Sequence, residues 1–274
     1  MQHIRFRLRV FLITFLAVIF CGSVGFMLIE DLSCMDALYF SVVTVATVGY
    51  GDVSPQTDEG KAFALVLIVM GVGTFLGVVA NATELMLNRR EQRARLEKLY
   101  MVIGAFFSRV GTDLLALFVE ADGALETIRD TYALRTDWSA PDFQRARQAL
   151  LRYNPKIDTG RVDLDRLCEF LAEREEFLLR LLENPTLLEH ESFTDLLWAV
   201  FHLAEELAHR DDKSSLPDSD LAHLRGDITR AYRGLLHEWL AYMEHLKKRY
   251  PYLFSLACRT NPFNKAASVI ITES

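Results

Sequence analysis

Two long uncharged runs of apolar residues dominate the first third of the chain. Residues 10–29 form a run of twenty residues without a charge, and residues 62–83 form a run of twenty-two. At about 1.5 Å of rise per residue, each run makes a helix of about 30 Å, which matches the hydrocarbon core of a bilayer. A core helix of a soluble protein rarely lacks a polar stripe over this length. Both runs are therefore predicted to be transmembrane helices.

The charges beside these runs predict how they are oriented. Basic residues precede the first run and follow the second. They are Arg5, Arg7 and Arg9 before the first run, and Arg89, Arg90, Arg93, Arg95 and Lys98 after the second. The connecting residues 30–61 carry six acidic residues and one basic residue, Lys61. Since basic flanks stay in the cytoplasm, we expect a multi-pass protein of the cell (inner) membrane with both termini cytoplasmic. The first run is long for a signal peptide and no clean cleavage site follows it, so cleavage is not expected.

A short apolar segment and a glycine-rich turn lie between the two runs. Residues 35–47 are apolar but cover only about half of the length needed to cross a bilayer, and Asp36 stands where a carboxylate stabilises a helix start. The sequence that follows is TVGYGD, from Thr47 to Asp52. Irregular backbone at membrane depth is tolerated only where it is buried in protein or lines water. The pattern predicts a re-entrant helix and a loop whose carbonyl groups face something polar.

The TVGYGD sequence is identical to the signature of potassium channels, and residues 10–90 resemble the pore domain of the prokaryotic family with two transmembrane helices per chain. The resemblance implies a filter in which four carbonyl groups replace water around K⁺, those of Thr47, Val48, Gly49 and Tyr50. Gly49 and Gly51 supply the backbone freedom that such a column of carbonyls requires. Because one chain supplies one strand of the filter, a homotetramer in a lipid bilayer is expected, with K⁺ as the permeant ion.

The same resemblance implies supporting roles for four residues around the filter, namely Thr44, Tyr39, Gly51 and Asp52. The chain departs from the family pattern at two places. Tyr39 and Phe40 stand where many members have a pair of tryptophans, and Val43 stands where some have a carboxylate. We therefore expect a looser support behind the filter and an unchanged column of carbonyls.

The second run contains three glycines, Gly71, Gly73 and Gly77, within a stretch of seven residues. Glycine costs about 1 kcal/mol relative to alanine inside a helix, so this density indicates a use. The run resembles the inner helix of calcium-gated prokaryotic channels, which implies a gating hinge at Gly71 and Gly73; close packing of helices is the alternative, and Gly77 is assigned to packing. Glu84 is predicted to lie at the inner mouth, where four copies would concentrate cations, or to face solvent at the helix end.

The residues from 91 onward are predicted to form a cytosolic helical domain. Apolar residues recur at intervals of three and four over residues 167–183, 193–209 and 224–250. We expect an all-α protein in which the pore domain, residues 1–90, precedes a bundle of five or six helices. The chain lacks a GxGxxG motif and alternating strands and helices, which argues against a Rossmann-like ligand-binding domain. Residues 96–123 are apolar, but Arg109 and Asp113 favour a buried bundle helix over a third span.

Composition and the remaining motifs exclude several classes of partner and site. A net charge of −7 argues against nucleic acid as a partner, and four scattered cysteines without a CxxC motif are predicted to be free thiols. Glu206-x-x-His209 is one half of a di-iron motif that needs two, and residues 158–165 suit a turn and a helix cap better than a Ca²⁺ loop. The tail, residues 250–263, is predicted to dock onto the bundle.

The sequence thus predicts a K⁺-selective channel, not an enzyme, with no cofactor besides the permeant ion. Its helical domain is expected to assemble the channel or to gate it in response to an unidentified cytosolic ligand or partner. Two alternatives stay open. One is a sensor or a metal-binding helical enzyme domain that the pore module anchors, and the other is a non-selective cation channel, against which the filter residue Tyr50 argues.

Overall fold

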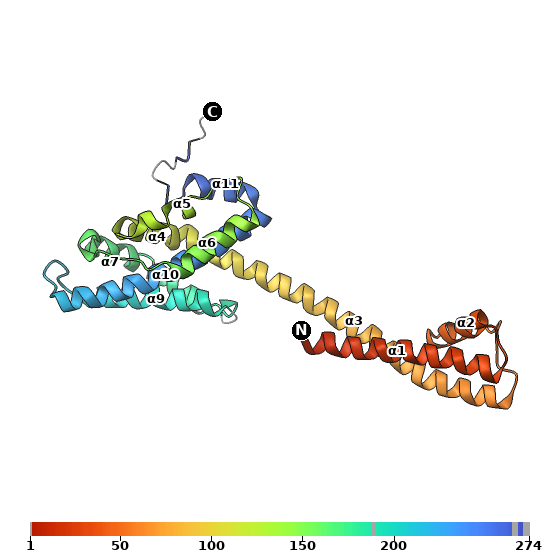
Figure 1. Ribbon diagram of the computed structural model, residues 1–274. Helices are drawn as coiled ribbons and strands as arrows, with labels where there is room; N and C mark the ends of the chain where they lie inside the picture. The colour runs from red at the N-terminus through yellow and green to blue at the C-terminus, as the bar shows by residue number, and fades with distance from the viewer. Residues whose placement is uncertain (1, 188–189, 265–267, 271–274) are drawn as a thin grey trace. The chain divides into compact units, whose positions relative to one another are not determined.

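The structure is a computed structural model that describes residues 2–187, 190–264 and 268–270. Within these residues the regular elements are helices, beside one isolated bridge between Asp122 and Ile157. The chain is all-α, as predicted. It divides into two compact units, Met1–Ala94 and Arg95–Ser274, where the sequence had placed the boundary after residue 90. Helix α3 (Asp58–Phe106) begins in the first unit, and its last residues belong to the second (Figure 1).

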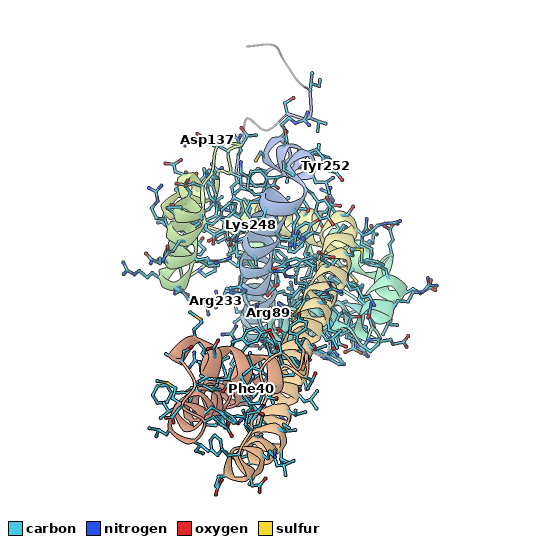
Figure 2. All side chains as sticks on the ribbon, turned by 90° about the vertical axis from the view of Figure 1, so that its right-hand side faces the viewer. Phe40, Arg89, Asp137, Arg233, Lys248 and Tyr252 are labelled. Atoms are coloured by element: carbon cyan, nitrogen blue, oxygen red, sulfur yellow. The ribbon has the colours of Figure 1, made fainter. Side chains whose placement is uncertain are left out.

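The first unit consists of α1 (Gln2–Ile29), the short α2 (Cys34–Val45) and the larger part of α3. In the described residues, α1 and α3 are long and apolar enough to cross a membrane. Only 17% of the residues in the most apolar window of each are buried, whereas a core helix of a soluble protein would be mostly buried. This exposure supports the two predicted transmembrane helices. Figure 2 labels Phe40 of α2, whose ring packs edge-on against Phe26 of α1.

The start of α2 is capped by a serine that the sequence analysis did not identify. The Ser33 hydroxyl accepts a hydrogen bond from the Asp36 N–H (3.1 Å) and donates one to the Asp36 carboxylate (2.7 Å). Asp36 therefore lies in the first turn, as predicted, and Ser33 satisfies one of the N–H groups that a helix start leaves unpaired.

One carboxylate joins the end of α1 to the start of α3. Glu30 accepts hydrogen bonds from the Thr57 hydroxyl (2.6 Å) and from the N–H groups of Gln56 and Thr57 (3.0 Å each). The bond from Thr57 is the main cause that lowers the pKa of Glu30 below its ordinary value. Gly60 permits this approach, because a Cβ atom there would lie 1.8 Å from the Glu30 carboxylate. The two ends of the segment that carries the pore loop are thereby held together.

The second unit contains eight helices after α3 in its described residues, where five or six were expected. The predicted helix over residues 167–183 is divided between α7 and α8, and the short α5 and the tail helix α11 add further elements. Their bounds are α4 (Thr112–Ala121), α5 (Arg129–Tyr132), α6 (Ala140–Arg152), α7 (Leu164–Ala172), α8 (Glu175–Leu182), α9 (Glu191–Ala208), α10 (Asp218–Arg249) and α11 (Pro251–Arg259).

Helix α10 is the centre of the second unit. It packs against α4, α6, α9 and α11 and carries two of the large aromatic side chains that the core buries almost completely, Tyr232 and Trp239. Between α3 and α4 the chain makes a π-helix, Phe107–Gly111, whose residues Phe107 and Val110 are buried in the same core. Burial of this segment agrees with the expectation of a bundle helix rather than a third span.

The chain after α10 docks onto this core, as predicted. Phe254 of α11 and Phe263 are almost completely buried. Asn261 donates a hydrogen bond from its side-chain amide to the Tyr132 carbonyl (2.9 Å) and accepts one from the Phe263 N–H (2.9 Å), so its buried polar atoms are paired. In Figure 2, Tyr252 marks α11 and Lys248 marks the end of α10.

Two aromatic residues of α11 allow a matched test of this docking. Phe254 is 1% exposed and Tyr252 is 71% exposed. Replacing a buried Phe by Ala is expected to cost about 3–5 kcal/mol, because transfer energy is lost and a cavity forms. Phe254→Ala should therefore lower the thermal midpoint of the full-length protein in detergent, followed by near-ultraviolet circular dichroism, whereas Tyr252→Ala should leave it unchanged. Equal effects of the two substitutions would contradict a docked α11.

Candidate functional site

The backbone of the loop after α2 is not helical and enters the left-handed region repeatedly. Three of its residues have positive φ angles: Thr47 (61°), Gly49 (59°) and Gly51 (78°). The left-handed region was expected for the two glycines, which adopt it without steric cost. It was not expected for Thr47, where a β-branched side chain makes this conformation cost about 1–2 kcal/mol. The surrounding contacts must therefore hold Thr47 in place.

Those contacts come from the end of α2. The Thr47 N–H donates to the Thr44 carbonyl (3.1 Å), and the N–H groups of Val48 and Gly49 both donate to the Val43 carbonyl (3.0 and 3.4 Å). Thr44 thus supports the loop through its backbone. The Val43 carbonyl was missed by sequence reasoning, which considered only the absent carboxylate of its side chain; no sequence signal could reveal it, because every residue has a carbonyl group.

These bonds determine which way the loop's carbonyl groups point. A trans peptide places the carbonyl of one residue opposite the N–H of the next, and the described residues contain no cis peptide bond. Since the N–H groups of Val48 and Gly49 point to Val43, the carbonyl groups of Thr47 and Val48 point away from α2. Among the described residues, no hydrogen bond is donated to the carbonyl oxygens of Thr47, Val48, Gly49 or Tyr50. Such a row of unpaired acceptors suits water or a dehydrated cation.

The outer end of the loop is held by a side-chain pair. The Tyr39 hydroxyl of α2 donates a hydrogen bond to the Asp52 carboxylate (2.8 Å). A hydrogen bond to an ionised acceptor is stronger than one between neutral groups. The structure thus brings together two residues that the sequence had assigned separately to filter support. The side chains of Val48 and Tyr50 are exposed on the single chain, at 51% and 71%.

The three glycines in the middle of α3, Gly71, Gly73 and Gly77, have different surroundings. A Cβ atom at Gly71 would lie 2.4 Å from the Val45 side chain of α2, and one at Gly77 would lie 2.3 Å from the Phe11 ring of α1. Gly73 has no such neighbour on the single chain. Helix α3 continues without a break through all three. The contacts at Gly71 and Gly77 are those of close packing, which for Gly71 is the alternative to the predicted hinge.

Glu84, predicted at the inner mouth, lies beside a basic residue of α1. Its carboxylate is 3.4 Å from the Arg7 guanidinium, and both side chains are about half exposed. An exposed pair of this kind contributes about 0–1 kcal/mol to stability. It also neutralises part of the charge that a ring of glutamates would present to cations.

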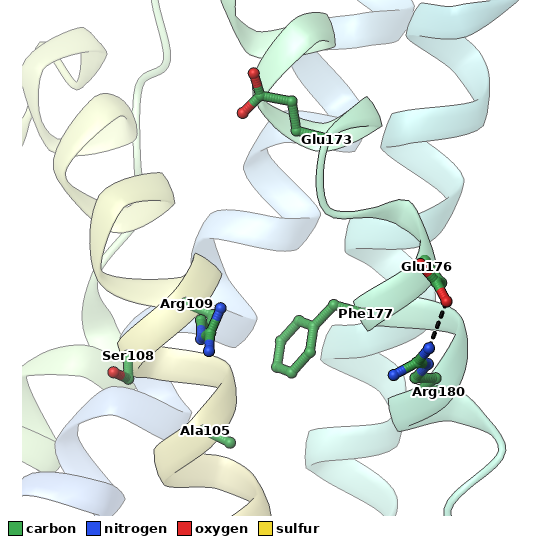
Figure 3. Close-up of a pocket in the computed structure, with 7 residues that line it drawn as sticks. All are labelled: Ala105, Ser108, Arg109, Glu173, Glu176, Phe177 and Arg180. Atoms are coloured by element: carbon green, nitrogen blue, oxygen red, sulfur yellow. Dashed lines mark hydrogen bonds and ion pairs between the residues drawn. The ribbon is translucent and has the colours of Figure 1, made fainter.

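The second unit has an open pocket beside the π-helix, lined by both charged and apolar side chains. Its volume is about 430 Å³, and Figure 3 shows Arg109 on one wall facing Phe177 on the other, with Glu176 paired to Arg180. Arg174, at the turn between α7 and α8, donates a hydrogen bond to the Arg109 carbonyl within the π-helix (3.0 Å). The cavity wall is thereby joined to the segment that continues from α3.

Comparison with known proteins gives a separate match for each of the two units of the chain. A family model described as "Ion channel" matches residues 13–88, which contain α2, the pore loop and most of the two long helices. A second model, "Uncharacterized protein MJ1433, C-terminal helical domain", matches residues 95–259. The protein "Uncharacterized protein MJ1433" of Methanocaldococcus jannaschii is 48% identical over 196 residues, which are 72% of this chain and 78% of that one.

Shorter matches concern proteins with potassium-channel names. "Probable potassium channel protein 2" of Methanocaldococcus jannaschii is 31% identical over 104 residues, 34% of this chain and 30% of that one. "Two-pore potassium channel 5" of Arabidopsis thaliana is 45% identical over 53 residues, 19% of this chain and 13% of that one. The chain spans less than a third of the length of these two relatives.

Fold, loop and comparisons define a membrane protein of the ion-channel class whose pore unit is followed by a helical domain. Since the second family model covers more than half of the chain, the protein belongs to the family of the MJ1433 C-terminal helical domain.

The glycines of α3 give a matched prediction. Gly71→Ala should destabilise the first unit, because overpacking against Val45 costs about 1–3 kcal/mol, more than the gain in helix propensity of about 1 kcal/mol. Gly73→Ala should keep or raise stability, since it has the same gain without a neighbour to displace. The measurement is the fraction of protein that survives heating in detergent, followed by gel filtration. A greater loss for Gly73→Ala would contradict the packing described here.

Proposed function

We propose that the protein is a homotetrameric K⁺-selective channel that conducts through the carbonyl groups of Thr47, Val48, Gly49 and Tyr50. The observation that carries the proposal is the row of unpaired carbonyl oxygens, with the adjacent N–H groups turned back to Val43. Carbonyl oxygens in this arrangement replace the hydration shell of a K⁺ ion. The potassium-channel names of the matching relatives support the choice of ion.

The proposal of four chains rests on the geometry of the loop. One chain presents oxygens on one side only, so an ion that moves along the loop would lack ligands on its other sides. Four identical strands around one axis would complete a cage of the kind described for carbonyl-lined filters. The exposed side chains of Val48 and Tyr50 would then find neighbours between chains, and the two apolar helices would face the bilayer.

The second unit is proposed to assemble or gate this pore. Its connection to the pore is helical, because α3 continues from the membrane-spanning residues through Phe106. A continuous helix transmits rotation or bending more directly than a flexible linker does. The gate is proposed at the inner helix, with bending at Gly71 and Gly73 and with Glu84 near the inner mouth. The cavity lined by Arg109 and Arg180 is a candidate site for the cytosolic ligand.

Ion flux into liposomes tests selectivity. With KCl and NaCl on opposite sides, the purified protein should give a reversal potential close to the K⁺ equilibrium value. Gly49→Asp should abolish or de-select this flux, because a Cβ atom strains the left-handed backbone (φ 59°) and a carboxylate enters the filter. Gly226→Asp introduces the same residue at an exposed helix position without near neighbours and should leave the flux unchanged. A wild-type reversal potential near zero would instead favour a non-selective cation channel.

Removal of the second unit tests its role. Single-channel recordings and native mass spectrometry would compare the full-length protein with a chain that ends at Ala94, where the two units divide. We expect either fewer tetramers, if the domain assembles the channel, or an altered open probability in intact tetramers, if it gates the pore. Intact tetramers with unchanged gating would contradict both roles.

A further inference from the structure

Three potential metal ligands, His202, His223 and Asp227, meet on the facing sides of α9 and α10, with the carboxylate of Glu206 beside them. His202 and Glu206 are one turn apart on α9, and His223 and Asp227 are one turn apart on α10. Figure 1 shows the two helices side by side, joined by residues 209–217. The tertiary structure thereby pairs two i, i+4 motifs that lie on opposite sides of a loop.

The distances between the ligand atoms fit one small ion. The His202 Nε2 atom lies 3.7 Å from Glu206 Oε1 and 3.8 Å from Asp227 Oδ2, and the His223 Nε2 atom lies 3.6 Å from Glu206 Oε2 and 3.3 Å from Asp227 Oδ2. Ligand atoms about 2.0–2.2 Å from a tetrahedral zinc ion stand about 3.3–3.6 Å apart. The donor atoms of the two histidines and Asp227 all lie within 4.8 Å of one another.

The buried oxygen of Asp227 gives a second, independent observation. Asp227 is 2% exposed, and no hydrogen bond reaches its Oδ2 atom among the described residues. A buried carboxylate oxygen without a partner is costly. The other oxygen, Oδ1, accepts a hydrogen bond from Arg230 (2.8 Å), which orients the Asp227 carboxylate as outer partners do around metal ligands. The neighbouring Glu206 differs, because its Oε2 atom, the one nearer His223, accepts a hydrogen bond from Arg210 (2.8 Å).

Simple ion pairs between imidazolium and carboxylate groups explain the cluster less well. Such pairs form hydrogen bonds at about 2.7–3.2 Å, whereas all four separations here are longer. The histidine side chains are about half exposed, and a groove of about 500 Å³ lined in part by His202 and Arg230 adjoins them. An ion therefore has a path from solvent, and water has room to complete its coordination.

We propose that His202, His223 and Asp227 bind one divalent first-row transition metal ion, with Zn²⁺ as the best match, that ties α9 to α10. Two imidazole nitrogens beside a carboxylate oxygen favour such an ion over Mg²⁺ or Ca²⁺, which prefer oxygen ligands alone. This proposal departs from the sequence-based expectation of no cofactor besides the permeant ion. That expectation considered only Glu206 with His209, whose ring instead contacts the Glu205 carbonyl (Nδ1 to O, 2.7 Å).

Metal titration of the untagged full-length protein in detergent tests the site. After treatment with a chelator and dialysis, calorimetric titration with Zn²⁺ should show one saturable site per chain. Titration with Co²⁺ should give the intense visible absorption of a four-coordinate centre. Zn²⁺ should also raise the thermal midpoint of unfolding, because it binds the folded state. None of these measurements depends on ion conduction, so they fail or succeed independently of the proposed channel function.

Three variants decide between a built site and incidental binding. His223→Gln and Asp227→Asn should each weaken Zn²⁺ binding by at least about tenfold, the lower end of the loss seen when even an outer partner is removed. His209→Gln, on a histidine near the cluster but outside it, should bind as the wild type does. His223 is exposed, so its variant keeps the test valid if Asp227→Asn does not fold. No saturable wild-type site, or equal losses in all three variants, would overturn the proposal.

Discussion

Backbone carbonyl groups that accept no hydrogen bond govern the architecture of the first unit. At membrane depth such groups are costly unless protein, water or an ion compensates them. The loop after α2 has four in succession, and the neighbouring N–H groups are occupied by Val43 and Thr44. Holding the loop open requires left-handed backbone at Thr47, which a β-branched residue adopts at a cost. Strain and unpaired acceptors together are typical of a functional site rather than of a connecting loop.

The remaining contacts of the first unit stabilise this loop from three sides. The end of α2 holds its beginning, the bond between Tyr39 and Asp52 holds its outer end, and Glu30 holds the segment that returns to α3. Gly60 and Gly71 are needed where a carboxylate and a valine approach α3 closely. Tyr39, which stands where many members of the resembled family have a tryptophan, supports the loop through one hydrogen bond from its hydroxyl to Asp52. The conformation of the loop thus depends on contacts with residues outside the loop as well as on its own sequence.

The second unit follows ordinary rules of helical packing around α10 and carries its polar groups at the edges of the core. One such group is the cluster on α9 and α10, and another lines the cavity beside the π-helix. Helix α3 has its last residues in this unit. The proposed metal ion would join the two helices whose mutual packing is most extensive in this core, and its effect would be to stiffen them.

Local patterns in the sequence were sufficient to predict the long helices and the loop after α2. Uncharged runs of about twenty residues predicted α1 and the membrane part of α3, periods of three and four predicted α9 and α10, and the TVGYGD sequence predicted a glycine-dependent loop after a short helix. These features depend on neighbours along the chain, so one sequence is sufficient to find them. The helix count was too low in part because the break between α7 and α8 has neither proline nor glycine to mark it, and in part because α5 and α11 are short.

Only the tertiary structure decided which distant groups meet. The carbonyl of Val43 and the hydroxyl of Tyr39 become supports because of where α2 ends, and Arg7 neutralises Glu84 across 77 positions of the chain. His202 and His223 share one carboxylate oxygen because α9 and α10 pack together. The periodicity of side chains along a helix predicts which face of the helix is polar. Which residues that face contacts depends on packing between helices, and no local pattern in a single sequence predicts that packing.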